Sequence, residues 1–225
     1  MKNLFFTTVI LLAAVIAIDA QTDSKSIMRR GDALVAQEKY KLAIEEYSKV
    51  STRDRDAYAK ASYNIGVCYY ELWETDEAIT FYKRAVELKA GNYPRASYAL
   101  GVALEDQSAT ADAKKAYEQA LIASRGEFVR ATYRLGLLAA KSGELEKAAA
   151  LFREAAARSG EHVPASHNNL GVMLARLGFL KAAEGEFLNA LKASGGRFDD
   201  ATHNLNLCRS LTASVKSYKL TIIQL

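Results

Sequence analysis

The sequence is poor in the residues on which strand-rich, disulfide-linked and metal-binding proteins depend. It has 2 prolines, 2 cysteines and 3 histidines among 225 residues. Because proline is scarce while Ala, Leu, Glu, Lys and Arg dominate, the composition favours helices and argues against a sheet. No Gly-rich phosphate loop, nucleophile elbow or catalytic cysteine–histidine pattern is visible. We therefore expect an all-α protein that is not an enzyme, with no catalytic residue, no cofactor and no metal site.

Long apolar runs are also missing, with one exception at the N-terminus. Lys2 is followed by an apolar run over residues 4–18 and then by Ala20, a small residue suited to cleavage. The run is shorter than the roughly 20 residues that span a bilayer, so the pattern is typical of a secretory signal peptide. We predict that residues 1–20 are a signal peptide and that no transmembrane span remains after its removal. A retained anchor is the alternative.

The charge balance bears on partners and on location. Removal of residues 1–20 takes Lys2 and Asp19 from totals of 30 basic and 26 acidic side chains, which leaves 29 and 25, a net charge of +4. These charges are spread along the chain, which fits an acidic protein or peptide partner and argues against a nucleic acid. We expect an exported protein, periplasmic or extracellular. Its short charged start and the lack of a disulfide framework favour a bacterial source.

A repeat of 35 residues runs through the rest of the chain. Helices that approach closely need small side chains and leave a space that an aromatic ring can fill. The recurring glycines are Gly31, Gly66, Gly101, Gly136 and Gly171. The aromatics, sixteen residues further on, are Tyr47, Tyr82, Tyr117, Phe152 and Phe187. An alanine stands four residues before each aromatic and, except at Val50, three residues after it.

Further markers predict where the helices begin and end. Residues that we interpret as hydrophobic staples at helix starts recur every 35 residues. They are Tyr58, Tyr93, Phe128, Val163 and Phe198. Glycines suited to capping the preceding helix ends are Gly91, Gly126, Gly160 and Gly195.

These markers resemble the tetratricopeptide repeat (TPR) family, whose units are antiparallel helix pairs with a small residue in the first helix and Ala, an aromatic and Ala in the second. The resemblance implies a right-handed superhelical solenoid of about five helix-turn-helix repeats within residues 24–198. The predicted units are residues 24–58, 59–93, 94–128, 129–163 and 164–198. We predict a capping helix over residues 199–217 and an apolar, strand-like tail over 218–225, which packs on the last unit or contacts a partner.

The end units and the cysteines fit a solenoid. Arg30 and Arg209 stand where inner units carry apolar residues, as is typical of solenoid ends that face water. Cys68 and Cys208 occupy the same core position of units four repeats apart. That separation is too large for a disulfide, which needs Cα atoms within about 7 Å. We therefore predict two buried free thiols.

In the tetratricopeptide repeat family the first helices line a concave groove, so the resemblance implies which side chains face a ligand. Helical spacing places a basic, an aromatic and an amide row there. The predicted groove residues are Lys60, Arg95 and Arg130; Tyr63, Tyr98, Tyr133, Asn168 and His203; and Asn64, Arg134, Asn169 and Asn204. An apolar row lies beside them: Val67, Val102, Leu137 and Val172. Rigid rings, amides and cations suit an extended peptide that carries carboxylates.

Two functions remain open. The first is a scaffold that binds a peptide or protein segment in the groove, and the second is a structural element that self-associates through its ends or its tail. The tyrosine row also has a structural interpretation, because tyrosines at repeat spacing often pack between helices. The carboxylate clamp of some family members is excluded, since Met28 and Asp32 stand where its Lys and Asn are required.

Overall fold

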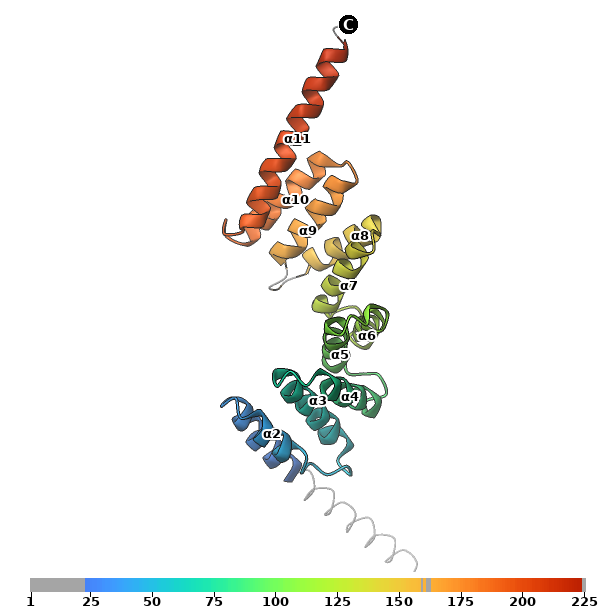
Figure 1. Cartoon of the computed structure of the whole chain (residues 1–225), viewed down its shortest axis with the longest axis vertical. Coiled ribbons are helices and arrows are strands. Elements are labelled where there is room, and N and C mark those ends of the chain that lie inside the picture. The colour runs from blue at the N-terminus through green and yellow to red at the C-terminus, as the bar shows by residue number, and fades with distance from the viewer. Residues whose placement is uncertain (1–22, 159, 161–162, 224–225) are drawn as a thin grey trace, which may run out of the picture. The chain divides into compact units, whose positions relative to one another are not determined.

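The computed structural model describes residues 23–158, 160 and 163–223, and this part of the chain is α-helical with short turns (Figure 1). The first helix is described over residues 23–35. It is followed by α2 (Tyr40–Tyr47), α3 (Arg55–Glu71), α4 (Thr75–Leu88), α5 (Pro94–Asp106), α6 (Thr110–Ala123), α7 (Val129–Lys141), α8 (Leu145–Ala156), α9 (Val163–Arg176), α10 (Leu180–Ala193) and α11 (Asp199–Ile223). The expected all-α class is confirmed. The predicted signal peptide, residues 1–20, lies outside the described residues.

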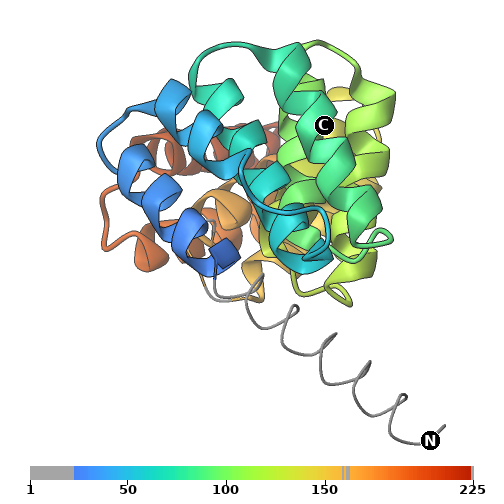
Figure 2. The same ribbon diagram turned by 90° about the horizontal axis from the view of Figure 1, so that it is seen from below.

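The helices form two compact units, Met1–Ser124 and Arg125–Leu225. In the first unit α3 packs on α4 and α5 packs on α6, with α2 against α3 and α4 against α5. In the second unit α7 packs on α8 and α9 packs on α10, with α8 against α9 and α10 against α11. Figure 2 shows the same helices from a direction at right angles to that of Figure 1. Within each unit a helix contacts its neighbours in sequence, which is the helix-turn-helix stacking expected of a solenoid.

The recurring glycines accommodate the recurring aromatic rings, as the spacing predicts. A Cβ atom added at any of the five glycines would lie 2.2–2.8 Å from a ring carbon of the aromatic in its own repeat. All five rings are buried, with at most 3 % of their surface exposed. Because the core is close-packed, a methyl group at these positions would displace a ring.

Left-handed backbone recurs at the turns, at one place in the first repeat and at two places in the later ones. All four glycines predicted to cap the second helices have positive φ, which confirms their conformation. A second set with positive φ ends the first helices, again 35 residues apart: Glu38, Trp73, Ser108, Gly143 and Gly178. The sequence analysis missed this second set because three of its five members are not glycine.

The predicted staples occupy two different situations. Tyr93 and Phe128 are the N-cap residues of α5 and α7, as expected for residues just ahead of a helix. Tyr58 is different, because α3 begins three residues before it. The Asp54 side chain caps this earlier start by accepting a hydrogen bond from the backbone N–H of Ala57 at 3.1 Å. The prediction for Tyr58 was therefore wrong, and this residue lies inside the helix.

The last helix is longer than the sequence analysis predicted. α11 has 25 residues and includes residues 218–223, which we expected to form a strand-like tail after a helix ending at residue 217. Extending an existing helix adds one backbone hydrogen bond for each residue fixed. A strand instead needs a partner strand, and the described residues contain none. Within the second unit α11 therefore extends past α10, which has 14 residues (Figure 1).

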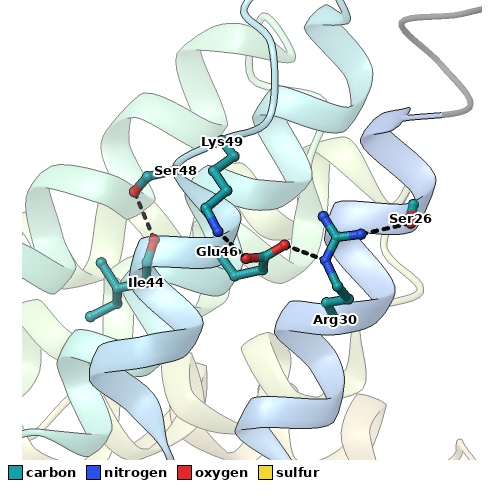
Figure 3. A network of polar contacts seen from close by, with 6 residues as sticks. All are labelled: Ser26, Arg30, Ile44, Glu46, Ser48 and Lys49. Carbon is teal, nitrogen blue, oxygen red and sulfur yellow. Dashed lines mark hydrogen bonds and ion pairs between the residues drawn. The ribbon is translucent and has the colours of Figure 1, made fainter.

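Both end arginines are held by a carboxylate of the neighbouring helix. Arg30 donates from Nε to Glu46 of α2, and Lys49 donates to the second oxygen of the same carboxylate (Figure 3). Arg209 of α11 donates from Nε to Glu184 of α10 at 2.7 Å. The two arginine side chains are 54 % and 53 % exposed. Each arginine is therefore exposed to water and also links the outer helix to its neighbour through an ion pair.

The Glu46 ion pairs predict a pH-dependent stability. Hydrogen bonds from Lys49 and Arg30 hold the pKa of Glu46 below its usual value of 4.5. A lowered folded-state pKa means that the contribution is present above the unfolded pKa and is lost as pH falls through the folded pKa. We expect Glu46→Gln to lower Tm at pH 7, and the difference from the parent protein to shrink as the pH falls below about 4. Glu45→Gln, on the exposed side of the same helix, is the control, and an equal response of both variants in thermal melts would contradict the assignment.

The two cysteines are buried and unpaired. Cys68 on α3 is 0 % exposed and Cys208 on α11 is 2 % exposed. Both are free thiols, which confirms the prediction.

Candidate functional site

The twelve predicted groove residues all lie on the first helix of a pair or on α11, and we call them together the first-helix face. In the first unit, Lys60, Tyr63 and Asn64 are on α3, and Arg95 and Tyr98 are on α5. In the second unit, Arg130, Tyr133 and Arg134 are on α7, Asn168 and Asn169 on α9, and His203 and Asn204 on α11. The structure thus divides the face between its two units.

The tyrosines of this face each rest on the buried ring of their own repeat. The Tyr98 ring centroid lies 5.7 Å from that of Tyr117, and Tyr133 lies 5.7 Å from Phe152. Tyr63 lies 5.9 Å from the Tyr82 ring. Because the three tyrosines are half-buried, they take part in packing and still present a surface to solvent. Packing and contact with a ligand are therefore compatible for this row.

All three residues of the basic row are exposed. Lys60 forms an ion pair of 2.7 Å with Asp56, one helical turn earlier on α3. Both side chains are more than half exposed, so the pair contributes only a few tenths of a kcal/mol, about 0.3. Asp56 also pairs with Lys89, just after α4, so its carboxylate is shared between two cations. Arg95 on α5 and Arg130 on α7 are exposed.

The amides of the second unit form a hydrogen-bonded chain across three helices. Asn204 of α11 donates from Nδ2 to Asn168 Oδ1 at 3.0 Å. Asn168 donates to Asn169 Oδ1 at 3.2 Å, and Asn169 donates to the Tyr133 hydroxyl of α7 at 3.2 Å. Asn168 is only 6 % exposed, so the middle of this hydrogen-bonded chain is buried. Asn169 and Asn204 are half-buried and keep hydrogen-bonding capacity beyond these bonds, because an amide has two N–H donors and two acceptor lone pairs.

The first unit has a carboxylate at the corresponding place, which the sequence analysis did not assign to the site. Asp32 accepts a hydrogen bond from the Tyr47 hydroxyl at 2.6 Å and one from Asn64 Nδ2 at 3.3 Å. Asp32 follows Gly31, so it stands in the register of the predicted apolar row, where Val67 is the next member. That break in an apolar row is the signal that could have identified it.

A second missed pair lies on α9 and α10. His167 Nδ1 is 2.7 Å from Glu186 Oε2, and both side chains are about one-fifth exposed, at 21 % and 24 %. In the 35-residue register His167 replaces the buried hydroxyl residues Ser62, Ser97 and Thr132. Its imidazole ring is larger than these side chains and reaches α10, where it contacts the carboxylate of Glu186.

This arrangement suits binding more than chemistry. Burial raises the pKa of Tyr82, and burial together with the bond to Asp32 raises the pKa of Tyr47, so both phenols are harder to ionise than a free tyrosine. No group of His, Cys, Asp and Glu side chains that could hold a metal ion occurs among the described residues. The face instead offers rings, cations and oriented amides, which pair with a peptide backbone and its carboxylates.

Comparison with known proteins places this architecture in a family. The tetratricopeptide repeat description matches residues 28–97, 98–162 and 133–201. No curated protein matches the chain in sequence.

Several solved structures share the fold. A crystal structure of MamA is 22 % identical, covers 73 % of this chain and 94 % of its own, and has a TM-score of 0.63. MamA from Desulfovibrio magneticus RS-1 is 20 % identical, with 78 % and 97 % covered and a TM-score of 0.63. YrrB, described as a TPR protein with an unusual peptide-binding site, is 20 % identical, with 84 % and 95 % covered and a TM-score of 0.63. At these identities the likeness concerns the fold.

The repeat markers, the stacked helix pairs and the family match agree with one another. The family match extends over residues 28–201, well over half of the 225 residues. The chain belongs to the tetratricopeptide repeat family and is a non-enzymatic scaffold for binding protein or peptide.

Proposed function

We propose that the chain is an exported scaffold of the cell envelope that holds an extended peptide or protein segment on its first-helix face. The observation that carries this proposal is the amide chain from Asn204 through Asn168 and Asn169 to Tyr133. It fixes the orientation of two half-exposed amides on neighbouring helices. Oriented amides suit the regularly spaced N–H and C=O groups of an extended backbone, because each can donate and accept.

Each unit has an exposed arginine on its first helices, which favours a segment that carries carboxylates. Arg95 and Arg130 are exposed on the same helices as the packed tyrosines Tyr98 and Tyr133. A guanidinium pairs with a carboxylate through two parallel hydrogen bonds, which adds geometric specificity to attraction. The half-buried rings add contact area at low entropic cost, because the packing already holds them.

The cell-envelope location rests on the sequence. The charged start, the apolar run over residues 4–18 and Ala20 support export. Among the described helices, none combines the length and the apolar character that a membrane crossing requires. Intact-mass measurement of the protein recovered from the native cell tests this part of the proposal, because cleavage after Ala20 leaves Gln21 as the first residue. An uncleaved chain recovered from the cytoplasm would contradict it.

The binding proposal predicts that Arg95→Ala with Arg130→Ala weakens partner capture. The mature chain, the double variant and a control with Lys83→Ala and Lys192→Ala are used to capture partners from an envelope extract, and the partners are identified by mass spectrometry. The control removes the same charge from exposed positions on the second helices α4 and α10. We expect the control to keep the partner and the double variant to bind it about 2- to 30-fold more weakly, since two exposed ion pairs together contribute about 0.4–2 kcal/mol.

Two results would count against the binding proposal. Equal loss of the partner in both variants would show that net charge, not the first-helix face, governs capture. Full retention by the double variant, with helical content unchanged in both proteins, would place the binding surface elsewhere on the molecule.

Self-association is a second candidate, favoured by α11. Leu207 and Leu211 are one helical turn apart on this helix and are 52 % and 46 % exposed. An exposed apolar pair on the last helix of a stack could pack against another copy. Sedimentation of the mature chain over a range of concentrations distinguishes the two, because a scaffold keeps its mass while a self-assembling chain grows. Leu207→Ser should abolish growth that depends on this helix.

A further inference from the structure

We propose that the chain has a second binding surface, at the turn between α3 and α4, which holds a cationic segment of a partner protein against Trp73. We call this surface the tryptophan edge and define it by residues 71–77 and 105–108. It uses none of the residues of the first-helix face.

The exposure of Trp73 is not explained by packing. Its side chain is 91 % exposed, the highest value among the exposed large apolar residues of the described chain. Its φ is +63°, a backbone conformation that residues with a Cβ adopt reluctantly. The equivalent turn residues of the other repeats are Glu38, Ser108, Gly143 and Gly178, so the turn itself requires no aromatic residue. The indole is therefore available for a contact outside the chain.

The neighbouring turn adds to the same surface. The Tyr70 hydroxyl of α3 donates to Asp106 Oδ2 at the end of α5, at 2.5 Å. Gln107, just after α5, donates from Nε2 to Asp76 Oδ1 on α4. These two bonds tie the α3–α4 turn to the α5–α6 turn. The α3–α4 turn, which carries Trp73, and the α5–α6 turn therefore lie next to each other in the first unit.

The charge of this edge is of one sign. Residues 71–77 and 105–108 contain six acidic residues and no Lys or Arg, although the chain as a whole has a net charge of +4. The acidic residues are Glu71, Glu74, Asp76, Glu77, Glu105 and Asp106. All except Glu105 are exposed. Such a concentration of carboxylates attracts cations and repels acidic segments.

An aromatic ring among carboxylates specifies the chemistry of the occupant. The face of an indole is the best of the protein side chains at binding a Lys ammonium or an Arg guanidinium. The surrounding carboxylates complement further cations on the same segment and steer its approach. A segment with several Lys or Arg residues satisfies both, whereas an apolar segment would leave the carboxylates desolvated. The occupant thus differs in charge from the carboxylate-bearing segment proposed for the first-helix face.

The chain contains one tryptophan, so fluorescence excited at the long-wavelength edge, where its 12 tyrosines hardly absorb, reports on Trp73 alone. The full mature chain is titrated with a synthetic peptide of alternating Arg and Gly, and separately with a peptide of equal length in which Gln replaces Arg. We expect a saturable fluorescence change with the Arg peptide and none with the Gln peptide. Raising the salt from about 50 mM to about 500 mM should weaken binding at least about tenfold, because the surface charges are screened.

Variants separate the ring from the charges, with binding followed by the anisotropy of a dye-labelled Arg peptide. Trp73→Gly is expected to keep the fold, because glycine suits the positive φ, and to weaken binding at least about tenfold. Glu74→Gln with Glu77→Gln should also weaken binding, with Trp73 still present. Phe179→Ala removes an exposed aromatic at another turn and should leave the affinity unchanged.

Four results would overturn the proposal. These are no saturable binding of the Arg peptide, equal binding of the Gln peptide, equal binding by folded Trp73→Gly, or a Trp73-dependent dimer in sedimentation. Equal binding by Trp73→Gly would mean that the carboxylates alone bind the peptide. A Trp73-dependent dimer would mean that the tryptophan edge binds a second copy of the chain. None of these outcomes depends on Arg95 or Arg130, so the test is independent of the function proposed for the first-helix face.

Discussion

Gly171→Ala is expected to destabilise the protein, whereas Gly185→Ala is expected to stabilise it, although both glycines lie inside helices of the same pair. A Cβ atom at Gly171 on α9 would lie 2.6, 2.8 and 3.0 Å from three ring carbons of Phe187. A Cβ atom at Gly185 on α10 would have no neighbour within 4 Å. The first substitution therefore overpacks the core, while the second only restricts the unfolded chain and favours the helix.

The expected magnitudes separate the two variants clearly. Replacing glycine by alanine in an exposed helix interior stabilises by about 0.5–1 kcal/mol, which is the expected gain for Gly185→Ala. Overpacking costs about 1–3 kcal/mol, which offsets this gain at Gly171 and leaves a net loss of up to about 2.5 kcal/mol. Denaturant unfolding of the two variants beside the parent protein measures both values.

A double variant tests whether the Phe187 ring is the cause. In a Phe187→Leu background the ring is absent, so Gly171→Ala should cost less, with a coupling energy of at least about 0.5 kcal/mol. If the cost of Gly171→Ala is the same in both backgrounds, a contact other than the one with the Phe187 ring causes the loss of stability. Stabilisation by Gly171→Ala would show that the two helices do not approach as closely as the structure describes.

The parts of the fold that follow from volume could be predicted from the sequence. A small residue at Gly101 and a ring at Tyr117, repeated at 35-residue intervals, leave one way to stack the helices, and the structure places them in contact. The same reasoning placed Cys68 and Cys208 in the core, where both are found. The same glycine and aromatic pair recurs in each unit, so one sequence contains several independent examples of the same packing contact.

The parts that depend on one side chain at one place could not be predicted. The amide chain needs Asn168 to turn inward, although its register in the repeat is that of Tyr63, Tyr98 and Tyr133. The local pattern of residues 218–223 suggested a strand, whereas α11 continues through them. Asp32 has partners on two other helices, so its role appears only when the helices are placed together.

The buried thiols should be almost inert in the folded protein and reactive once it unfolds. Burial and the nearby Glu71 carboxylate raise the pKa of Cys68 from 9.0 to about 11. Since each pKa unit changes the thiolate fraction tenfold, this shift alone slows alkylation at pH 8 about 100-fold. Burial likewise raises the pKa of Cys208, whose thiol donates to the backbone carbonyl of Leu180 at 3.2 Å.

Single-cysteine variants turn this protection into a measurement for each unit, because Cys68 lies in the first and Cys208 in the second. Cys208→Ala leaves Cys68 as the probe, and Cys68→Ala leaves Cys208. The reference is Lys83→Cys in a chain without the two native cysteines, since position 83 is exposed on α4. Cys68 should alkylate at least about 100-fold more slowly than this reference in buffer, and Cys208 should also react more slowly than the reference. In denaturant both should react at the reference rate. A native thiol that reacts at the reference rate in buffer would lie at the surface. Since both thiols are buried in the structure, this result would show that the helices of that unit do not stack as described.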